Sequence, residues 1–119
     1  MLNGDSNTDV AEREVFSLMA GDNRPTALVS LNNSMTIGVL KALRMLDLSI
    51  PSDVAFVCYD DFEWSDLFEP KLTAAAQDVT TIGATAVELL LRRIHGHDAP
   101  AQHIRVPTTF HHRTSCGCT

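Results

Sequence analysis

Three apolar segments of this chain each end in a side chain that can hydrogen-bond a ligand. Asn32 follows residues 27–31, Asp60 follows residues 54–59, and Gln77 with Asp78 follows residues 72–76. Two amides and an ionised carboxylate together provide both donors and acceptors of hydrogen bonds. Such a set suits a polyhydroxylated ligand, provided that the three segments are strands that end at one edge of a sheet.

Aromatic side chains shortly after Asp60 add a second kind of contact; they are Phe62, Trp64 and Phe68. An aromatic face can stack on the apolar face of a sugar ring or of a base, and we expect Trp64 to do so. Packing in the core or at an interface is the commoner role of such side chains. The polar candidates have structural alternatives as well, since Asn32 is placed to cap a helix, and Asp60 and Asp61 to be solvated loop acids.

Hydrophobic periodicity predicts the elements that would position these side chains. Apolar residues recur at helical spacing in residues 9–20, 35–46 and 81–94. Short apolar runs predict strands at 27–31, 54–59 and 72–76, and the run 54–59 is apolar throughout, as in a strand buried on both faces. Residues 103–107 alternate weakly, which predicts an edge strand that ends at Pro107. Residues 62–70 are irregular, and the tail from Phe110 has no clear period.

The order of these elements predicts an α/β fold with a mainly parallel sheet and flanking helices. In open sheets of this kind, ligands bind in the crevice at the carboxyl ends of the strands. If the first two strands are parallel, Asn32 and Asp60 lie together at that edge, and Gln77 can join them.

Composition excludes several classes of protein. The chain has 119 residues, of which 45% are hydrophobic and 20% charged, as in one globular domain of ordinary size. Nine basic residues against fifteen acidic ones give a formal net charge of -6, which argues against a surface that grips nucleic acid by itself. No apolar run is long enough to span a membrane. Three unevenly placed cysteines and a polar N-terminus favour a reducing, cytoplasmic compartment.

Motifs for catalysis are missing or incomplete. The chain has neither a glycine-rich phosphate loop nor a nucleophile elbow. A pair of acids after a strand, such as Asp60-Asp61, also occurs in phosphoacceptor receiver domains. Those domains need a lysine after a late strand, however, and the only lysines here, Lys41 and Lys71, do not follow one. We therefore expect no enzymatic activity.

The C-terminal run His111-His112-Arg113-Thr114-Ser115-Cys116-Gly117-Cys118 holds four possible ligands for a soft metal. Their spacing is tighter than in common structural zinc sites. We expect a frayed tail here, with the metal site as the alternative, and we predict no metal and no cofactor.

Several short motifs, in order, resemble segments of lactose-repressor-type (LacI/GalR) transcription regulators. They are Arg24-Pro25-Thr26-Ala27 through Asn32 and Gly38, then Ile50-Pro51-Ser52-Asp53-Val54 and Val57-Cys58-Tyr59-Asp60-Asp61, then Pro70-Lys71-Leu72-Thr73 with Gln77 and Ile82-Gly83, and finally Arg113-Thr114-Ser115. Each motif is weak alone, but their order and spacing are specific, and the match runs almost without gaps from about Gly4 to Ser115.

The resemblance implies a partial sensor domain of the periplasmic-binding-protein-like fold (type I). Residues 1–119 would form the C-terminal effector-binding lobe, with the DNA-binding headpiece and most of the first lobe absent. By matching positions, Asn32 and Asp60 would hydrogen-bond an effector, often a sugar, while Gln77 and Asp78 would mark the hinge entry between lobes. The second helix and residues 62–68 would form dimer contacts. Where some members carry an aromatic effector contact, this chain has Ser6.

We therefore predict the sensing and dimerising part of such a regulator, which binds a sugar or sugar derivative through Asn32, Asp60, Trp64 and Gln77. We expect a homodimer that meets DNA only through the headpiece and has no membrane partner. The alternative is a sugar-binding protein of the same fold without a transcriptional role. Since one lobe supplies only some of the contacts, we expect weak or absent effector binding by this chain alone. The helix at 81–94 would either fold back on the sheet or expose its apolar face.

Overall fold

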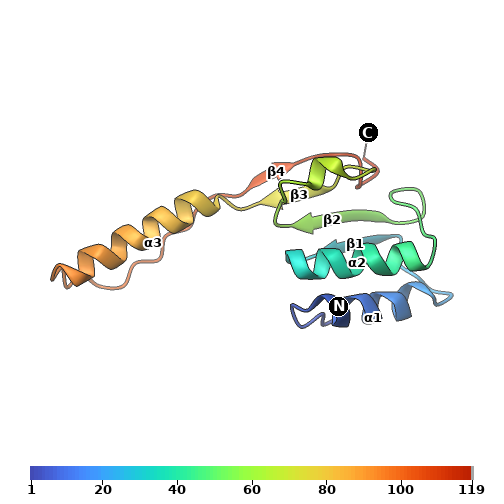
Figure 1. Cartoon of the computed structure of the whole chain (residues 1–119), viewed down its shortest axis with the longest axis horizontal. Helices are drawn as coiled ribbons and strands as arrows, with labels where there is room; N and C mark the ends of the chain where they lie inside the picture. Colours follow the sequence, from blue (N-terminus) through green and yellow to red (C-terminus); the bar gives the residue numbers. More distant parts are fainter. Residues whose placement is uncertain (119) are drawn as a thin grey trace. The chain divides into compact units, whose positions relative to one another are not determined.

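The computed structural model describes residues 1–118. It divides the chain into two compact units, one formed by Met1–Ala76 with the segment that starts at Phe110, and the other by Gln77–Thr109. The elements, labelled in Figure 1, are α1 (Thr8–Met19), β1 (Ala27–Ser30), α2 (Asn33–Met45), β2 (Ala55–Tyr59), the short 3-10 helix η1 (Ser65–Leu67), β3 (Thr73–Ala76), α3 (Val79–Ile94) and β4 (Thr109–His111).

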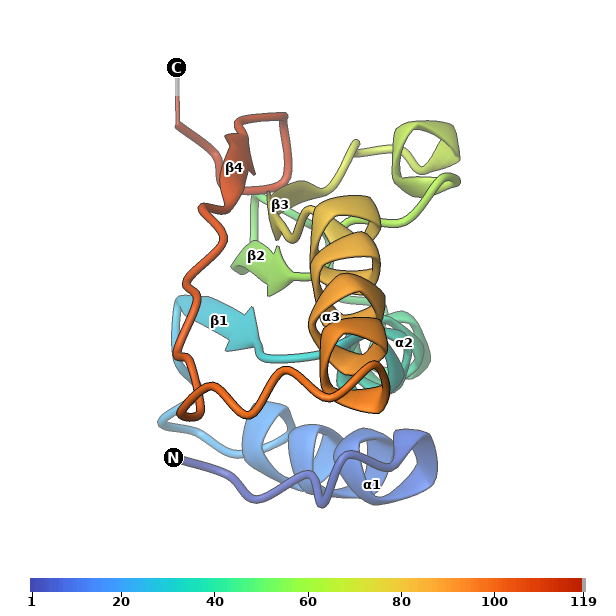
Figure 2. The same cartoon turned by 90° about the vertical axis from the view of Figure 1, so that its left-hand side faces the viewer.

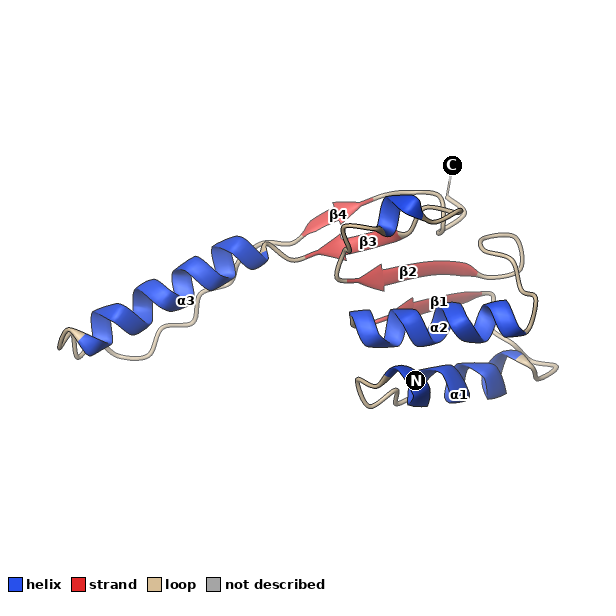
Figure 3. Ribbon diagram, in the orientation of Figure 1, coloured by secondary structure: helices blue, strands red, loops and turns tan. Residues whose placement is uncertain are grey.

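The strands form one four-stranded sheet in the order β1-β2-β3-β4. Figure 2 shows them in a view turned by 90° from that of Figure 1. β1 pairs with β2 in parallel, with Ser30 opposite Cys58, and β2 pairs with β3 in parallel, with Cys58 opposite Ala74. The arrow of β4 points the other way (Figure 3). The sheet is thus mixed but mostly parallel, which confirms the predicted α/β class.

Helices α1 and α2 approach each other closely because of Gly38. A methyl group at this position would come within 2.5 Å of the carbonyl oxygen of Thr8 and 2.7 Å of the Ala11 side chain. The Thr8 hydroxyl also donates a hydrogen bond to the carbonyl oxygen of Ser34. Glycine is therefore required where the start of α1 crosses α2, and the Thr8 hydrogen bond ties the first turn of α2 to α1.

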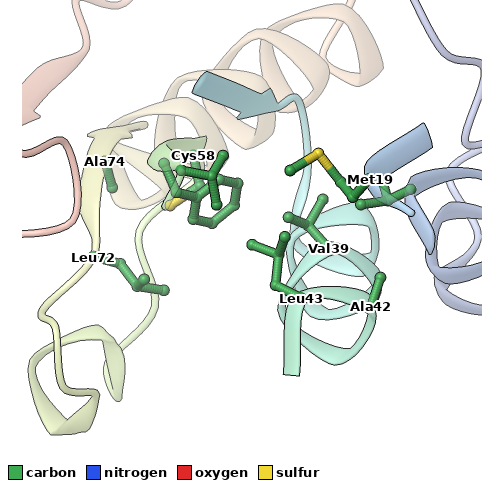
Figure 4. Close-up of a cluster of buried hydrophobic side chains, with 10 residues drawn as sticks. Met19, Val39, Ala42, Leu43, Cys58, Leu72 and Ala74 are labelled. Carbon is green, nitrogen blue, oxygen red and sulfur yellow. The ribbon is translucent and has the colours of Figure 1, made fainter. Parts of the chain in front are cut away.

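The core of the first unit lies between the sheet and these helices (Figure 4). It consists of Val15, Met19, Val39, Ala42, Leu43, Val54, Phe56, Cys58, Leu72 and Ala74, none of which is more than 6% exposed. Burial is the main cause that raises the pKa of the Cys58 thiol to about 11. This cysteine therefore stays neutral and acts as a small apolar side chain.

Two strand predictions are wrong. The first is that residues 54–59 form a strand buried on both faces. In β2, side chains instead alternate between buried and half-buried, so only one face is covered, and the neighbouring strand β1 leaves Val29 66% exposed. Residues 103–107 form no strand, and β4 begins only at Thr109, after Pro107. β4 is hydrogen-bonded to the four-residue strand β3, so the edge strand forms only where that partner is present.

In the second unit, α3 begins two residues earlier than predicted. The side chain of Asp78 caps it, with the carboxylate accepting hydrogen bonds from the backbone N–H and the hydroxyl of Thr81. No residue of α3 is buried, and its apolar side chains Ile82, Val87, Leu90, Leu91 and Ile94 are 41–68% exposed. These side chains are therefore exposed in α3, in agreement with one of the two expectations for this helix. Among residues 1–118, no helix is long and apolar enough to cross a bilayer.

Candidate functional site

Asn32 and Asp60 occupy equivalent positions at the carboxyl edge of two neighbouring strands. Ser30 in β1 lies opposite Cys58 in the parallel strand β2. Asn32 comes two residues after Ser30, and Asp60 comes two residues after Cys58. Both side chains are half-buried. The parallel arrangement on which the sequence argument depended is therefore present, and the two polar groups come from adjacent strand ends.

Asn32 has a structural role that the sequence also predicted. Its Oδ1 accepts a hydrogen bond from the backbone N–H of Met35 at 2.8 Å, which caps α2. Its Nδ2 donates to the hydroxyl of Ser6 at 3.0 Å. Nδ2 has a second N–H, which can donate a hydrogen bond to a ligand at the strand edge. Because the cap fixes the amide, Asn32 is held in one orientation, as a ligand contact requires.

Asp60 adopts an uncommon backbone conformation. Its φ is +75°, in the left-handed region that non-glycine residues rarely occupy, while its backbone N–H donates to the carbonyl oxygen of Ala75 at 2.9 Å. Ser6, the partner of Asn32, also has a positive φ of +52°. Residues held in such conformations concentrate at functional sites, where the surrounding structure imposes them.

The other two candidates are Gln77 in the second unit and Trp64 in the first. Gln77 is exposed and opens the second unit, immediately before the Asp78 cap of α3. Trp64 stacks on Phe62 with ring centroids 4.0 Å apart and contacts Phe68 at 5.1 Å. Together with side chains of α2, Trp64 and Phe68 line a groove of about 840 Å³ whose wall includes neither Asn32 nor Asp60. The structure thus places Trp64 beside α2 and not with the two polar candidates.

Asp61, the neighbour of Asp60, is not a solvated loop acid. Its two carboxylate oxygens accept hydrogen bonds from the Arg113 guanidinium at 2.9 and 2.7 Å, and both side chains are about 15% exposed. The Arg113 hydrogen bonds are the main reason that the pKa of Asp61 lies below its ordinary value. Arg113 also donates to the carbonyl oxygen of Leu72 and contacts Asp66, so it ties the C-terminal segment to the loop after β2.

Ser115 shows that the prediction of a frayed C-terminal tail is wrong. It is fully buried, and its hydroxyl donates to the carbonyl oxygen of Phe56 at 2.7 Å. The oxygen of this Ser115 hydroxyl accepts a hydrogen bond from the N–H of Thr73 at 2.8 Å. Its backbone bonds to Phe56 and Lys71 as well. Ser115 therefore joins β2 to the segment that leads into β3. The only signal in the sequence was the Arg113-Thr114-Ser115 motif.

Comparison with known proteins places this geometry in a family. The model of the periplasmic binding protein-like domain matches residues 2–116. The probable opine utilization operon repressor of Rhizobium rhizogenes is 36% identical over 103 residues, which are 86% of this chain and 52% of that protein. The lactose operon repressor of Rhizobium radiobacter is also 36% identical over 103 residues, which are 87% of this chain and 90% of that protein.

A solved structure with the same arrangement is that of a LacI family transcriptional regulator from Enterococcus faecium with bound ribose. It is 28% identical, with a TM-score of 0.79 over 92% of this chain and 40% of that one. The chain thus spans about half of one curated relative, nine-tenths of another and two-fifths of this solved chain. It belongs to the periplasmic-binding-protein-like domain family, and its relatives are repressors of the LacI type.

Proposed function

We propose that this chain is the effector-sensing part of a LacI/GalR-type transcriptional regulator in the cytoplasm, and that its effector is a sugar or a sugar derivative. The observation that carries the proposal is the parallel register of β1 and β2, which sets Asn32 and Asp60 at equivalent positions on one sheet edge. This edge is where open α/β sheets bind their ligands. The relative from Enterococcus faecium, with ribose bound, supports the class of effector.

The two side chains are suited to a vicinal diol. An ionised carboxylate accepts hydrogen bonds from two hydroxyl groups, whereas the amide N–H of Asn32 donates to a hydroxyl oxygen. Each such bond contributes about 1 kcal/mol and more where the partner is charged. Two residues therefore support only weak binding, and Gln77 stays a further candidate in the second unit.

The groove beside α2 supports a second part of the proposal, which is assembly with another copy of the chain. Its wall combines apolar side chains, among them Leu40, Trp64 and Phe68, with the charged Lys41 and Arg44. Aromatic and arginine side chains are enriched at protein interfaces. The resemblance assigns dimer contacts to these same two segments. In this proposal, DNA is contacted by a headpiece outside this stretch of sequence.

The test of effector binding is a titration of the isotope-labelled chain with ribose, galactose and lactose, followed by amide chemical shifts. We expect saturable shifts centred on Ser6, Asn32 and Asp60. Asn32→Asp keeps the oxygen that caps α2 but removes the amide donor, and Asp60→Asn removes the charge. Both variants should lose the response while they keep the fold.

Asp47→Asn is the matched control for Asp60→Asn. Asp47 is another acid with a positive φ (+54°), but it lies beyond the other end of α2 and is exposed. It should leave the sugar response unchanged. Shifts that saturate at another surface, or that survive both site variants, would remove the basis for the assignment.

For assembly, Trp64→Ala should shift a dimer toward the monomer in sedimentation experiments, and an unchanged dimer would contradict the use of the groove.

A further inference from the structure

The segment after β4 brings three soft metal ligands together. A ring nitrogen of His112 and the Sγ atoms of Cys116 and Cys118 all lie within 4.8 Å of one another, and His112 Nε2 is 3.1 Å from Cys116 Sγ. We propose that His112, Cys116 and Cys118 form a binding site for a thiophilic divalent cation of the Zn²⁺ type. This site shares no residue with the candidate effector site of Asn32 and Asp60.

Hydrogen bonds of the residues between them hold two of these ligands, His112 and Cys116, in place. Arg113 is fixed by Asp61 and by the carbonyl oxygen of Leu72, and Ser115 is fixed by its bonds to Phe56 and Thr73. His112 directly precedes this anchored stretch and Cys116 directly follows it. Since the stretch between them is tied to the sheet, the two ligands face each other without the ordering cost that a free tail would have.

Gly117 brings the third ligand back toward the other two. Its φ is +69°, and a methyl group there would come within 3.2 Å of the Pro51 side chain. This conformation turns the chain so that the N–H of Cys118 donates to the Sγ of Cys116 at 3.3 Å. The turn thus places both sulfur atoms on the same side as the imidazole.

The ligand set and its spacing fit zinc. Zinc binds cysteine sulfur at about 2.3 Å and histidine nitrogen at about 2.0–2.1 Å, so tetrahedral ligands lie about 3.5–3.8 Å apart. The distance of 3.1 Å between His112 and Cys116 and the upper limit of 4.8 Å for the three ligand atoms bracket that spacing. Two thiolates and an imidazole favour soft and borderline metals over Mg²⁺ or Ca²⁺, which prefer oxygen. Three protein ligands leave the fourth position for water, because the site is at the surface.

Binding is tested with Co²⁺, which reports its ligands by absorption, and then with Zn²⁺ in competition. The chain is kept reduced and metal-free before the titration. We expect one Co²⁺ per chain, with thiolate charge-transfer bands and the visible bands of tetrahedral cobalt, and displacement by one equivalent of Zn²⁺. Absence of thiolate bands, or one metal per two chains, would overturn a site made by a single chain.

Variants separate this site from chance binding. Cys118→Ser and His112→Gln should each weaken binding by roughly 100-fold or more, since changes to groups that merely orient ligands already cost about 10–100-fold. His111→Gln is the matched control, because His111 points toward Asp61 at 3.9 Å and lies outside the cluster. It should bind like the unmodified chain. An equal loss of metal affinity in His111→Gln, or an unchanged metal affinity in Cys118→Ser, would contradict the proposal.

Gly117→Ala tests the turn while it keeps all three ligands. The new methyl group meets Pro51 and the positive φ is unfavourable for alanine. We expect weaker Co²⁺ binding with the charge-transfer bands retained at saturation. Circular dichroism of each variant checks that the fold persists, which is expected because the Cys118 and His112 side chains are exposed. Unchanged affinity in Gly117→Ala would show that the turn does not organise the site.

Discussion

Helices α2 and α3 are built alike but are used differently. Each begins at a side-chain cap, Asn32 for α2 and Asp78 for α3, and each has an apolar face. α2 buries Thr36, Gly38, Val39, Ala42 and Leu43, whereas α3 buries no residue at all. Capping and periodicity thus determine where a helix forms, but they do not determine whether its apolar face finds a partner within the chain.

The two helices also affect different properties of the chain: α2 its stability and α3 its association with other molecules. The apolar face of α2 contributes to the free energy of folding of the first unit, because it packs against α1 and the sheet. An exposed apolar stripe such as that of α3 marks a surface that favours association. Substitutions in the two helices should therefore have effects on different quantities.

The largest contrast is expected from the same substitution in the two helices. Leu43 in α2 is 1% exposed and Leu90 in α3 is 57% exposed. Leu43→Ala should lower the free energy of unfolding by roughly 2–5 kcal/mol, since it leaves a cavity in the core. Leu90→Ala should change it by less than about 0.5 kcal/mol. Urea unfolding followed by circular dichroism measures both, and similar losses in the two variants would show that α3 contributes to stability as α2 does.

The next largest effect should come from the segment that closes the first unit. Ser115→Ala removes a hydroxyl that serves two buried partners, the carbonyl oxygen of Phe56 and the N–H of Thr73. Leaving both without a partner should cost roughly 2–4 kcal/mol. Ser17→Ala, at an exposed position of α1, is the control and should be nearly neutral. If Ser115→Ala unfolds at the same urea concentration as the unmodified chain, the tail does not anchor the sheet.

Ser115 illustrates what the sequence could not show. Its partners Phe56 and Thr73 are 59 and 42 residues away along the chain, and a serine in a polar tail carries no local pattern of burial. β4 was missed for the same reason, because its three residues are all exposed and it forms only beside β3. Long-range pairing of this kind leaves no periodicity in the sequence.

The elements that were predicted well depend on local pattern. The helices at 9–20 and 35–46 and the first two strands follow from hydrophobic spacing, and a helix between two short apolar runs favours a parallel pair of strands. The positions of Asn32 and Asp60 follow from that pairing, while their role in binding stays a prediction. Trp64 was assigned to the same site from its nearness in sequence, but the 3-10 helix and the aromatic stack carry it toward α2.

A smaller effect, specific to the first unit, is expected from pH. The hydrogen bonds from Arg113 lower the pKa of Asp61, so the folded chain binds that proton less readily than the unfolded chain. The stabilisation is complete above the ordinary carboxyl pKa of about 4 and is lost as pH falls through the lowered value. At neutral pH, Asp61→Asn should cost roughly 1–2 kcal/mol, since the pair is only partly shielded from solvent.

Unfolding of both proteins between neutral pH and pH 3 measures this contribution. The difference between the unmodified chain and Asp61→Asn should shrink below about pH 4. Asp66→Asn is a useful control, because Asp66 also contacts Arg113 but is 61% exposed. It should alter the pH dependence much less. A difference that stays constant with pH would show that the charge of Asp61 does not stabilise the fold.

The smallest expected change concerns the two helix caps and tests the difference between α2 and α3 most directly. Asn32→Ala should lower the free energy of unfolding by about 1 kcal/mol, because α2 cannot fray without loosening the core. Asp78→Ala should instead leave the urea midpoint unchanged and accelerate amide hydrogen exchange in the first turn of α3, where Thr81 loses its partner. A helix that buries nothing can fray without cost to the rest of the chain. If Asp78→Ala lowered the urea midpoint as much as Asn32→Ala does, α3 would have to share in the cooperative core, and its exposed face would need another explanation.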